Sequence, residues 1–117
     1  MTDATVSLKD DRDVEEIVQE MVRRIVEAVH PNKIILFGSY ARGEAGEDSD
    51  LDLMVIAPSE APRHRRTGPI LRALRGILFP KDVVWYTQEE IDEWRGVRSH
   101  LVSRVMDEGR VLYEKPT

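Results

Sequence analysis

Two aspartates, Asp50 and Asp52, stand one residue apart in an otherwise apolar run that reaches Ala57. If this run is a strand, both carboxylates project from one face, with their Cα atoms about 6.6 Å apart. Two ionised acids at that separation repel one another unless a cation lies between them. Mg²⁺ prefers hard oxygen ligands and completes its shell with water and phosphate oxygens. A third acid, Asp82, opens another apolar run and completes a magnesium site if the two strands are neighbours.

A glycine and a serine, Gly38 and Ser39, follow directly after the apolar run 33–37. Glycine lets the backbone approach a ligand closely, and free N–H groups at the start of a helix bind phosphate, to which the Ser39 hydroxyl adds a hydrogen bond. With the acids, this turn supplies the parts for an in-line displacement at phosphorus, with two metal ions about 3.5 to 4 Å apart. An isolated Asp-x-Asp or Gly-Ser pair is more often a plain turn, so the interpretation depends on their combination.

The stretch GSYARGEAGEDSDLDLMVI, residues 38–56, resembles the signature of nucleotidyltransferases of the DNA polymerase β superfamily, in the minimal MNT-type branch. The leading helix, the KDVVWY strand and the closing MDEGRVLYE are similar to that branch as well, so the resemblance covers most of the chain. It implies a metal-binding and catalytic triad of Asp50, Asp52 and Asp82, with Asp82 as the preferred base. The positions that it assigns to the nucleotide triphosphate, or to the loop that supports it, are Gly38, Ser39, Arg42 and Ser49.

A nucleotidyl transfer needs an acceptor held in line with the α-phosphate, and this chain is too short for a separate acceptor-binding module. We therefore expect a partner chain. The resemblance implies a helical HEPN-domain RNase toxin as that partner, and an antitoxin that transfers AMP from ATP to a toxin tyrosine. Two other functions stay open, which are neutralisation of a toxin by occlusion alone and transfer to a small molecule. The donated nucleotide, the acceptor and assembly into a homo-oligomer stay open as well.

Length and composition indicate one domain over residues 1–117, since 117 residues do not suffice for two cores. The net charge of −5 argues against general binding to nucleic acid, which depends on many Lys and Arg side chains. No apolar run approaches the roughly 18 to 20 residues of a membrane span, and no secretory leader opens the chain, so the cytoplasm is the expected compartment. The absence of cysteine excludes disulfides and thiolate metal sites.

Apolar periodicity and turn residues predict an α/β (α+β) fold, with a small mixed sheet flanked by helices. The resemblance implies its nucleotidyltransferase (polymerase β-like) version. The expected helices are 14–29, a short one from 39 to 42, 69–79, 87–94 and 97–107, and the expected strands are 33–37, 50–57, 82–86 and an edge strand at 111–113. The candidates for helix caps are Asp10, Asp11 and Asp13 for the first helix, and a Thr87-x-x-Glu90 capping box for the fourth.

One segment, residues 63–81, carries six basic residues and no acid. Such a segment is most often a solvated face, and contact with phosphate or an acidic partner is the alternative. The three histidines are far apart and lack ligand spacing, which favours surface or helix-end positions. Tyr40, beside the Gly-Ser turn, either lines a base pocket or packs in the core.

Overall fold

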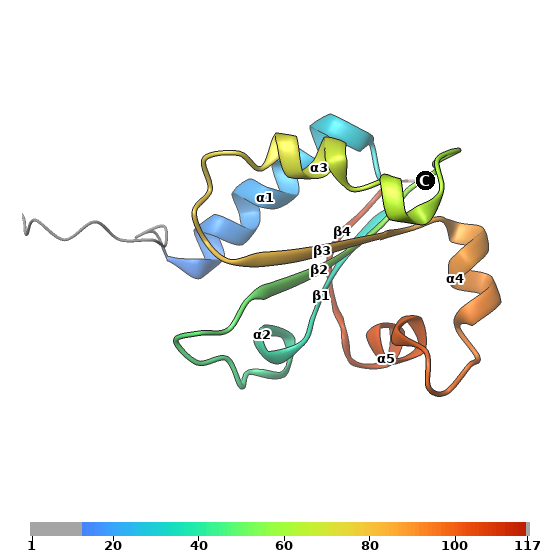
Figure 1. Cartoon of the computed structure of the whole chain (residues 1–117). Helices are drawn as coiled ribbons and strands as arrows, with labels where there is room; N and C mark the ends of the chain where they lie inside the picture. The colour runs from blue at the N-terminus through green and yellow to red at the C-terminus, as the bar shows by residue number, and fades with distance from the viewer. Residues whose placement is uncertain (1–12, 117) are drawn as a thin grey trace, which may run out of the picture.

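A four-stranded mixed sheet forms the centre of the molecule (Figure 1). Its strand order is β3-β2-β1-β4. The strands are β1 (Lys33–Phe37), β2 (Leu51–Ile56), β3 (Lys81–Tyr86) and β4 (Arg110–Glu114). β1 pairs antiparallel with both β2 and β4, whereas β2 and β3 run parallel. This computed structural model, which describes residues 13–116, confirms the predicted α/β class and mixed sheet.

Helices cover both faces of the sheet (Figure 1). α1 (Val14–Val29) and α3 (Gly68–Ala73) lie on one face, and α4 (Gln88–Trp94) and α5 (Leu101–Glu108) lie on the other. The short helix α2 (Ser39–Arg42) follows β1, and a 3₁₀ turn, η1 (Arg63–Arg65), precedes α3. Within residues 13–116, no helix is long and apolar enough to cross a membrane.

The side chains of β2 divide between the two layers by their position. Leu51 and Leu53 belong to the core under α1 and α3, whereas Met54 and Ile56 belong to the core under α4 and α5. Because side chains alternate along a strand, Asp52 lies on the α4 and α5 face. The observed strand is one residue shorter at each end than expected, so Asp50 stands just before it.

Two helix boundaries follow the expected capping signals. Asp13 Oδ1 accepts a hydrogen bond from Glu15 N at 2.8 Å at the start of α1, and His30 ends this helix with a left-handed φ of 48°. Thr87 and Glu90 form both hydrogen bonds of the predicted capping box at α4. The other cap candidates, Asp10 and Asp11, lie outside the described residues.

The prediction of a helix over 69–79 is wrong for the second half of this range. α3 ends at Ala73, and Gly76 turns the chain with a φ of 90°. Since glycine adopts a positive φ at little cost, the helix does not continue through this position. Beyond the turn Ile77 is buried while Leu78 is 59% exposed, which is the alternation of extended chain.

The last helix begins at Leu101 and not at Val97 as expected. His100 precedes it, and its Nδ1 accepts a hydrogen bond from Val102 N at 3.1 Å. The His100 ring also stacks on Trp94, with ring centroids 4.4 Å apart. His100 is therefore a helix cap, in line with the helix-end position expected for it, and it ties α5 to α4.

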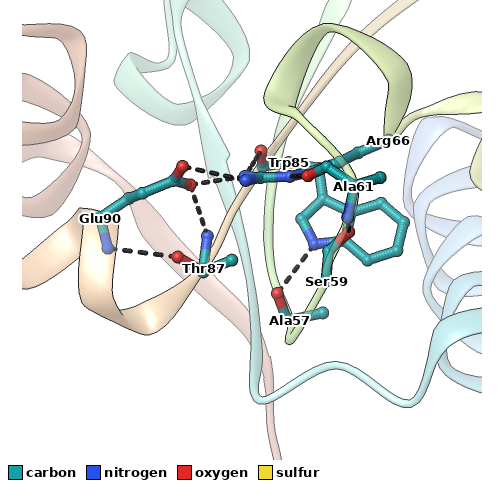
Figure 2. Close-up of polar contacts among 7 residues, drawn as sticks. All are labelled: Ala57, Ser59, Ala61, Arg66, Trp85, Thr87 and Glu90. Carbon is teal, nitrogen blue, oxygen red and sulfur yellow. Dashed lines mark hydrogen bonds and ion pairs between the residues drawn. The ribbon is translucent and has the colours of Figure 1, made fainter.

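Arg66 is buried although it belongs to the basic segment 63–81. Figure 2 shows its guanidinium between α4 and the chain that precedes α3. Its Nη atoms donate to the Glu90 carboxylate at 2.5 and 3.0 Å, and its Nε donates to the Ala61 carbonyl at 2.8 Å. Nη1 also donates to the Trp85 carbonyl at 3.3 Å. For this residue the expectation of a solvated face is wrong, because Glu90 neutralises it inside the fold.

Candidate active site

Asp52 and Asp82 are direct neighbours across the parallel strands β2 and β3. Residues at one register position of parallel strands point to the same face, with about 4.8 Å between the strands. That face is the one covered by α4 and α5, because Tyr86, which shares the alternation of Asp82, belongs to their core. Asp50 stands just before β2 and acts on Asp52 electrostatically. The structure thus brings the three acids together at one edge of the sheet.

Burial raises the pKa of Asp52 above its ordinary value, and the carboxylates of Asp82 and then Asp50 raise it further. Arg42 acts in the opposite direction and lowers the pKa of Asp52. Proximity of like charges and loss of water both disfavour the ionised carboxylate. A cation bound among these acids would relieve both effects.

Gly38 lies directly against the Asp52 carboxylate. Its φ is 76°, and a Cβ built on it would collide with Asp52 Oδ2 and lie 3.1 Å from Asp52 Cγ. Only glycine fits this position without displacing the acid or straining the backbone. Ser39, which begins α2 directly after Gly38, is therefore held next to the acids.

The other two candidate residues of the signature, Arg42 and Ser49, both contact the loop that joins α2 to β2, and Arg42 also reaches α5. Arg42 Nε donates to Glu44 Oε1 at 3.0 Å, and its Nη1 lies 3.9 Å from Glu108 Oε2 on α5. Ser49 Oγ accepts a hydrogen bond from Gly46 N at 2.9 Å, which closes the acidic loop before β2. Ser49 therefore shapes the loop, whereas Arg42 faces the acids.

Tyr40 packs into the opposite layer of the molecule. Its ring meets the Phe79 ring edge-on, with centroids 5.9 Å apart and an interplanar angle of 66°. Tyr40 also contacts the core under α1 and α3, whereas the acids lie on the other face. Of the two roles left open for Tyr40, the structure favours packing.

The three acids offer the donor chemistry that suits Mg²⁺, because carboxylate oxygens are its preferred protein ligands. Within residues 13–116, however, no three His, Asp or Glu side chains are arranged so that they could hold a metal ion by themselves. Mg²⁺ is usually held by one or two carboxylates with substrate phosphates and water, so a complete protein cage is not required. The acids fit a metal that arrives with a phosphate ligand better than a permanently bound ion.

A pocket of about 160 Å³ opens beside Gly38. Its walls are Phe37, Gly38 and Arg42 on one side and Leu101, Arg104, Val105 and Glu108 of α5 on the other. Sequence reasoning missed the contribution of α5, because it expected a helix over 97–107 but named none of its residues as a site candidate. The available signal was its spacing, since positions 101, 104, 105 and 108 form one stripe that mixes apolar and charged residues.

A mixed sheet with acids on adjoining parallel strands, opposite a Gly-Ser turn, is the arrangement of a nucleotidyltransferase. The family of nucleotidyltransferase domains matches residues 12–112 of the chain. The chain therefore belongs to this family, and the predicted enzyme class and resemblance are confirmed.

Relatives agree with this assignment. The chain is 32% identical over 83 residues to a Methanocaldococcus jannaschii protein named "Putative protein adenylyltransferase MJ0604". The aligned residues cover 69% of this chain and 77% of that protein. Two solved structures share the fold, each at 20% sequence identity. One is described as "a putative nucleotidyltransferase from Sulfolobus solfataricus", with a TM-score of 0.62 over 86% of this chain and 79% of that chain. The other is a toxin-antitoxin with AMP-PNP, with a TM-score of 0.61 over 83% of this chain and 73% of that chain.

Proposed function

We propose that this chain transfers AMP from ATP to a tyrosine of a partner protein, in a reaction that depends on Mg²⁺, and that the partner is a HEPN-domain toxin which it neutralises. The observation that carries this proposal is the pairing of Asp52 with Asp82 against the Gly38 turn. The name of the M. jannaschii relative supports a protein as the acceptor. The neighbour solved as a toxin-antitoxin complex with AMP-PNP supports both the nucleotide and the kind of partner.

Each residue of the site has its own role in the proposed transfer of AMP. The acceptor oxygen bonds to the α-phosphorus of ATP, the bond from that phosphorus to the oxygen that bridges to the β-phosphorus breaks, and pyrophosphate leaves with the electron pair. Asp82, which is exposed, takes the acceptor's proton. Gly38 and Ser39 hold the triphosphate beside the acids, and Arg42 adds a positive charge. Mg²⁺, held by Asp50, Asp52 and Asp82, would neutralise charge on the phosphates.

The test is transfer to the product of the neighbouring reading frame. The purified chain is incubated with Mg²⁺, each nucleoside triphosphate in turn and that product, which is then weighed by mass spectrometry. We expect a gain of one or more adenylyl groups on a tyrosine with ATP alone. A partner that binds the chain and gains no mass with any nucleotide would overturn the enzymatic function.

A second function, neutralisation by occlusion alone, is favoured by one observation: within the described part of the chain, the acids do not form a complete metal site. The double substitution D50N/D52N separates the two functions. If catalysis neutralises the toxin, this variant still forms the complex and no longer protects cells. The matched control is D92N/D107N, which removes two exposed aspartates of α4 and α5 and should protect cells fully.

A further inference from the structure

The pocket beside Gly38 lies between the signature turn and α5. Its α5 wall consists of residues at positions i, i+3, i+4 and i+7, which lie on one side of a helix. Leu101 and Val105 pack into the core at this point, so that Arg104 and Glu108 stand at the rim of the pocket. The packing of these apolar residues thus orients α5 so that Arg104 lines the pocket beside the Gly38 turn.

The end of α5 is held against β1, the strand that leads into Gly38. Gly109 N donates to Val105 O at 2.7 Å, and a Cβ built on Gly109 would collide with Ile35 Cγ2 of β1. Only glycine allows this close approach of the helix end to the strand. Because both pocket walls are anchored to β1, the spacing between Arg104 and Gly38 belongs to the rigid part of the fold.

The charges of the pocket favour an anion. Arg42 already contacts Glu44 and Glu108, at 3.0 and 3.9 Å. The Arg104 backbone N–H donates to the His100 carbonyl at 3.4 Å. Its side chain is exposed and, within the described range 13–116, its guanidinium makes no hydrogen bond or ion pair. Because Arg42 is paired with Glu44 and Glu108, the Arg104 guanidinium is the charged group of the lining that is left to bind an anion.

We propose that this pocket binds the polyphosphate end of the donor nucleotide, and that Arg104 contacts the phosphates that leave as pyrophosphate. This inference rests on the proposed nucleotidyl transfer and names a substrate contact that the signature does not contain. Gly38 touches the Asp52 carboxylate and also lines the pocket. A nucleotide with its α-phosphorus at the acids would therefore extend its β- and γ-phosphates across Gly38 toward Arg104. Guanidinium groups bind phosphate through charge-assisted hydrogen bonds.

Titration calorimetry on the full chain with Mg²⁺ tests the proposal, using ATP, AMP and inorganic tripolyphosphate as ligands. The variant R104Q should bind ATP and tripolyphosphate about tenfold more weakly, the loss typical of one charge-assisted contact, and AMP within about twofold of the parent chain. The matched control R75Q loses the same charge from an exposed arginine of the opposite layer. It should bind all three ligands like the parent chain.

Three results would overturn the proposal, and they differ in what else they affect. If R104Q weakens AMP binding as much as ATP binding, the pocket holds the base or ribose. If R104Q binds ATP and tripolyphosphate like the parent chain, Arg104 does not contact the phosphates, and the proposed enzymatic function is untouched. If the parent chain binds no nucleotide at all, the proposed function fails together with the inference.

Discussion

Asp52 and Asp82 face each other across β2 and β3 at the one register position where both strands carry an acid. Burial raises the pKa of Asp52, and repulsion from the Asp82 and Asp50 carboxylates raises it further. The pair therefore works against folding in the protein alone. We attribute its presence to the proposed reaction, in which a bound cation would compensate the charge of the two carboxylates.

The first prediction is that D52N stabilises the fold near neutral pH while it abolishes nucleotidyl transfer. The folded pKa of Asp52 is raised above its ordinary value of 3.8, so the unfolded chain ionises first as the pH rises. Stability is thus lost as the pH rises from that value through the folded pKa, and asparagine escapes this loss. Urea unfolding at several pH values measures the difference, which should widen from about pH 4 toward neutrality.

The control for this prediction is D107N, which removes an exposed aspartate of α5. Its stability relative to the parent chain should not change over the same pH range. If D52N were less stable than the parent chain at neutral pH, the raised pKa of Asp52 in the folded protein would be refuted.

The second prediction concerns Gly38. G38A should lower the free energy of unfolding by about 1 to 3 kcal/mol, because alanine is strained at this φ and ψ, and should abolish transfer because the new methyl group displaces Asp52. G43A is the matched control, since Gly43 has a similar φ of 74° but no atom within 4 Å of a built Cβ. We expect G43A to lose stability through strain alone and to keep its activity. Equal activity losses in both variants would contradict the role assigned to Gly38.

The third prediction concerns the buried pair of Arg66 and Glu90. E90Q should destabilise the fold by about 2 to 3 kcal/mol, because it leaves the buried Arg66 guanidinium without a countercharge. E89Q, at the exposed neighbouring position, should stay within about 0.5 kcal/mol of the parent chain. Chemical denaturation of the three chains measures these differences, and equal stability of E90Q and E89Q would show that the pair adds nothing.

The same pair gives a pH dependence of the opposite sign to that of Asp52. The hydrogen bond that the Glu90 carboxylate accepts from Arg66 lowers the pKa of Glu90 below its ordinary value of 4.5. The stability that ionised Glu90 contributes is therefore fully present above pH 4.5 and is lost as the pH falls through the folded pKa. The advantage of the parent chain over E90Q should shrink only in that acid range.

The fourth prediction separates metal from nucleotide. Because the acids within residues 13–116 do not form a complete metal site, Mg²⁺ alone should change the melting temperature little. Mg²⁺ with ATP should stabilise the fold, by about 2.7 kcal/mol at a ligand concentration a hundredfold above the dissociation constant. EDTA should remove this stabilisation, and D50N/D52N should lack it. An equally large effect of Mg²⁺ alone would point to a preformed metal site.

Local signals sufficed to predict the four strands to within a residue or so, but not their order in the sheet. β1 could be predicted to the residue because Pro31 and Gly38 bound a run of apolar residues, and α4 because Thr87 and Glu90 complete a capping box. The period of two along a strand predicted that Asp50 and Asp52 lie together, and the two do interact electrostatically although Asp50 stands just before β2. These features depend on residues within a few positions of one another.

The features that could not be predicted depend on residues far apart in the sequence. The sequence around Arg66 predicts a surface residue, because its partner Glu90 is 24 positions later and meets it only in the folded chain. Arg104 reads as the polar side of a packing helix, and its place beside Gly38 exists only because Gly109 seats α5 on β1. The spacing within α5 places Arg104 on one stripe with Leu101 and Val105, but it does not tell which part of the fold that stripe faces.

The parallel pairing of β2 with β3 has a consequence for the order in which the protein becomes competent. Parallel strands require a crossover, here residues 57–80, so Asp52 is synthesised well before Asp82 can dock beside it. A ribosome-bound chain that ends before β3 holds the complete Gly-Ser signature and only part of the carboxylate cluster. We therefore expect the chain to become able to bind its substrate only after β3 has been synthesised and has paired with β2.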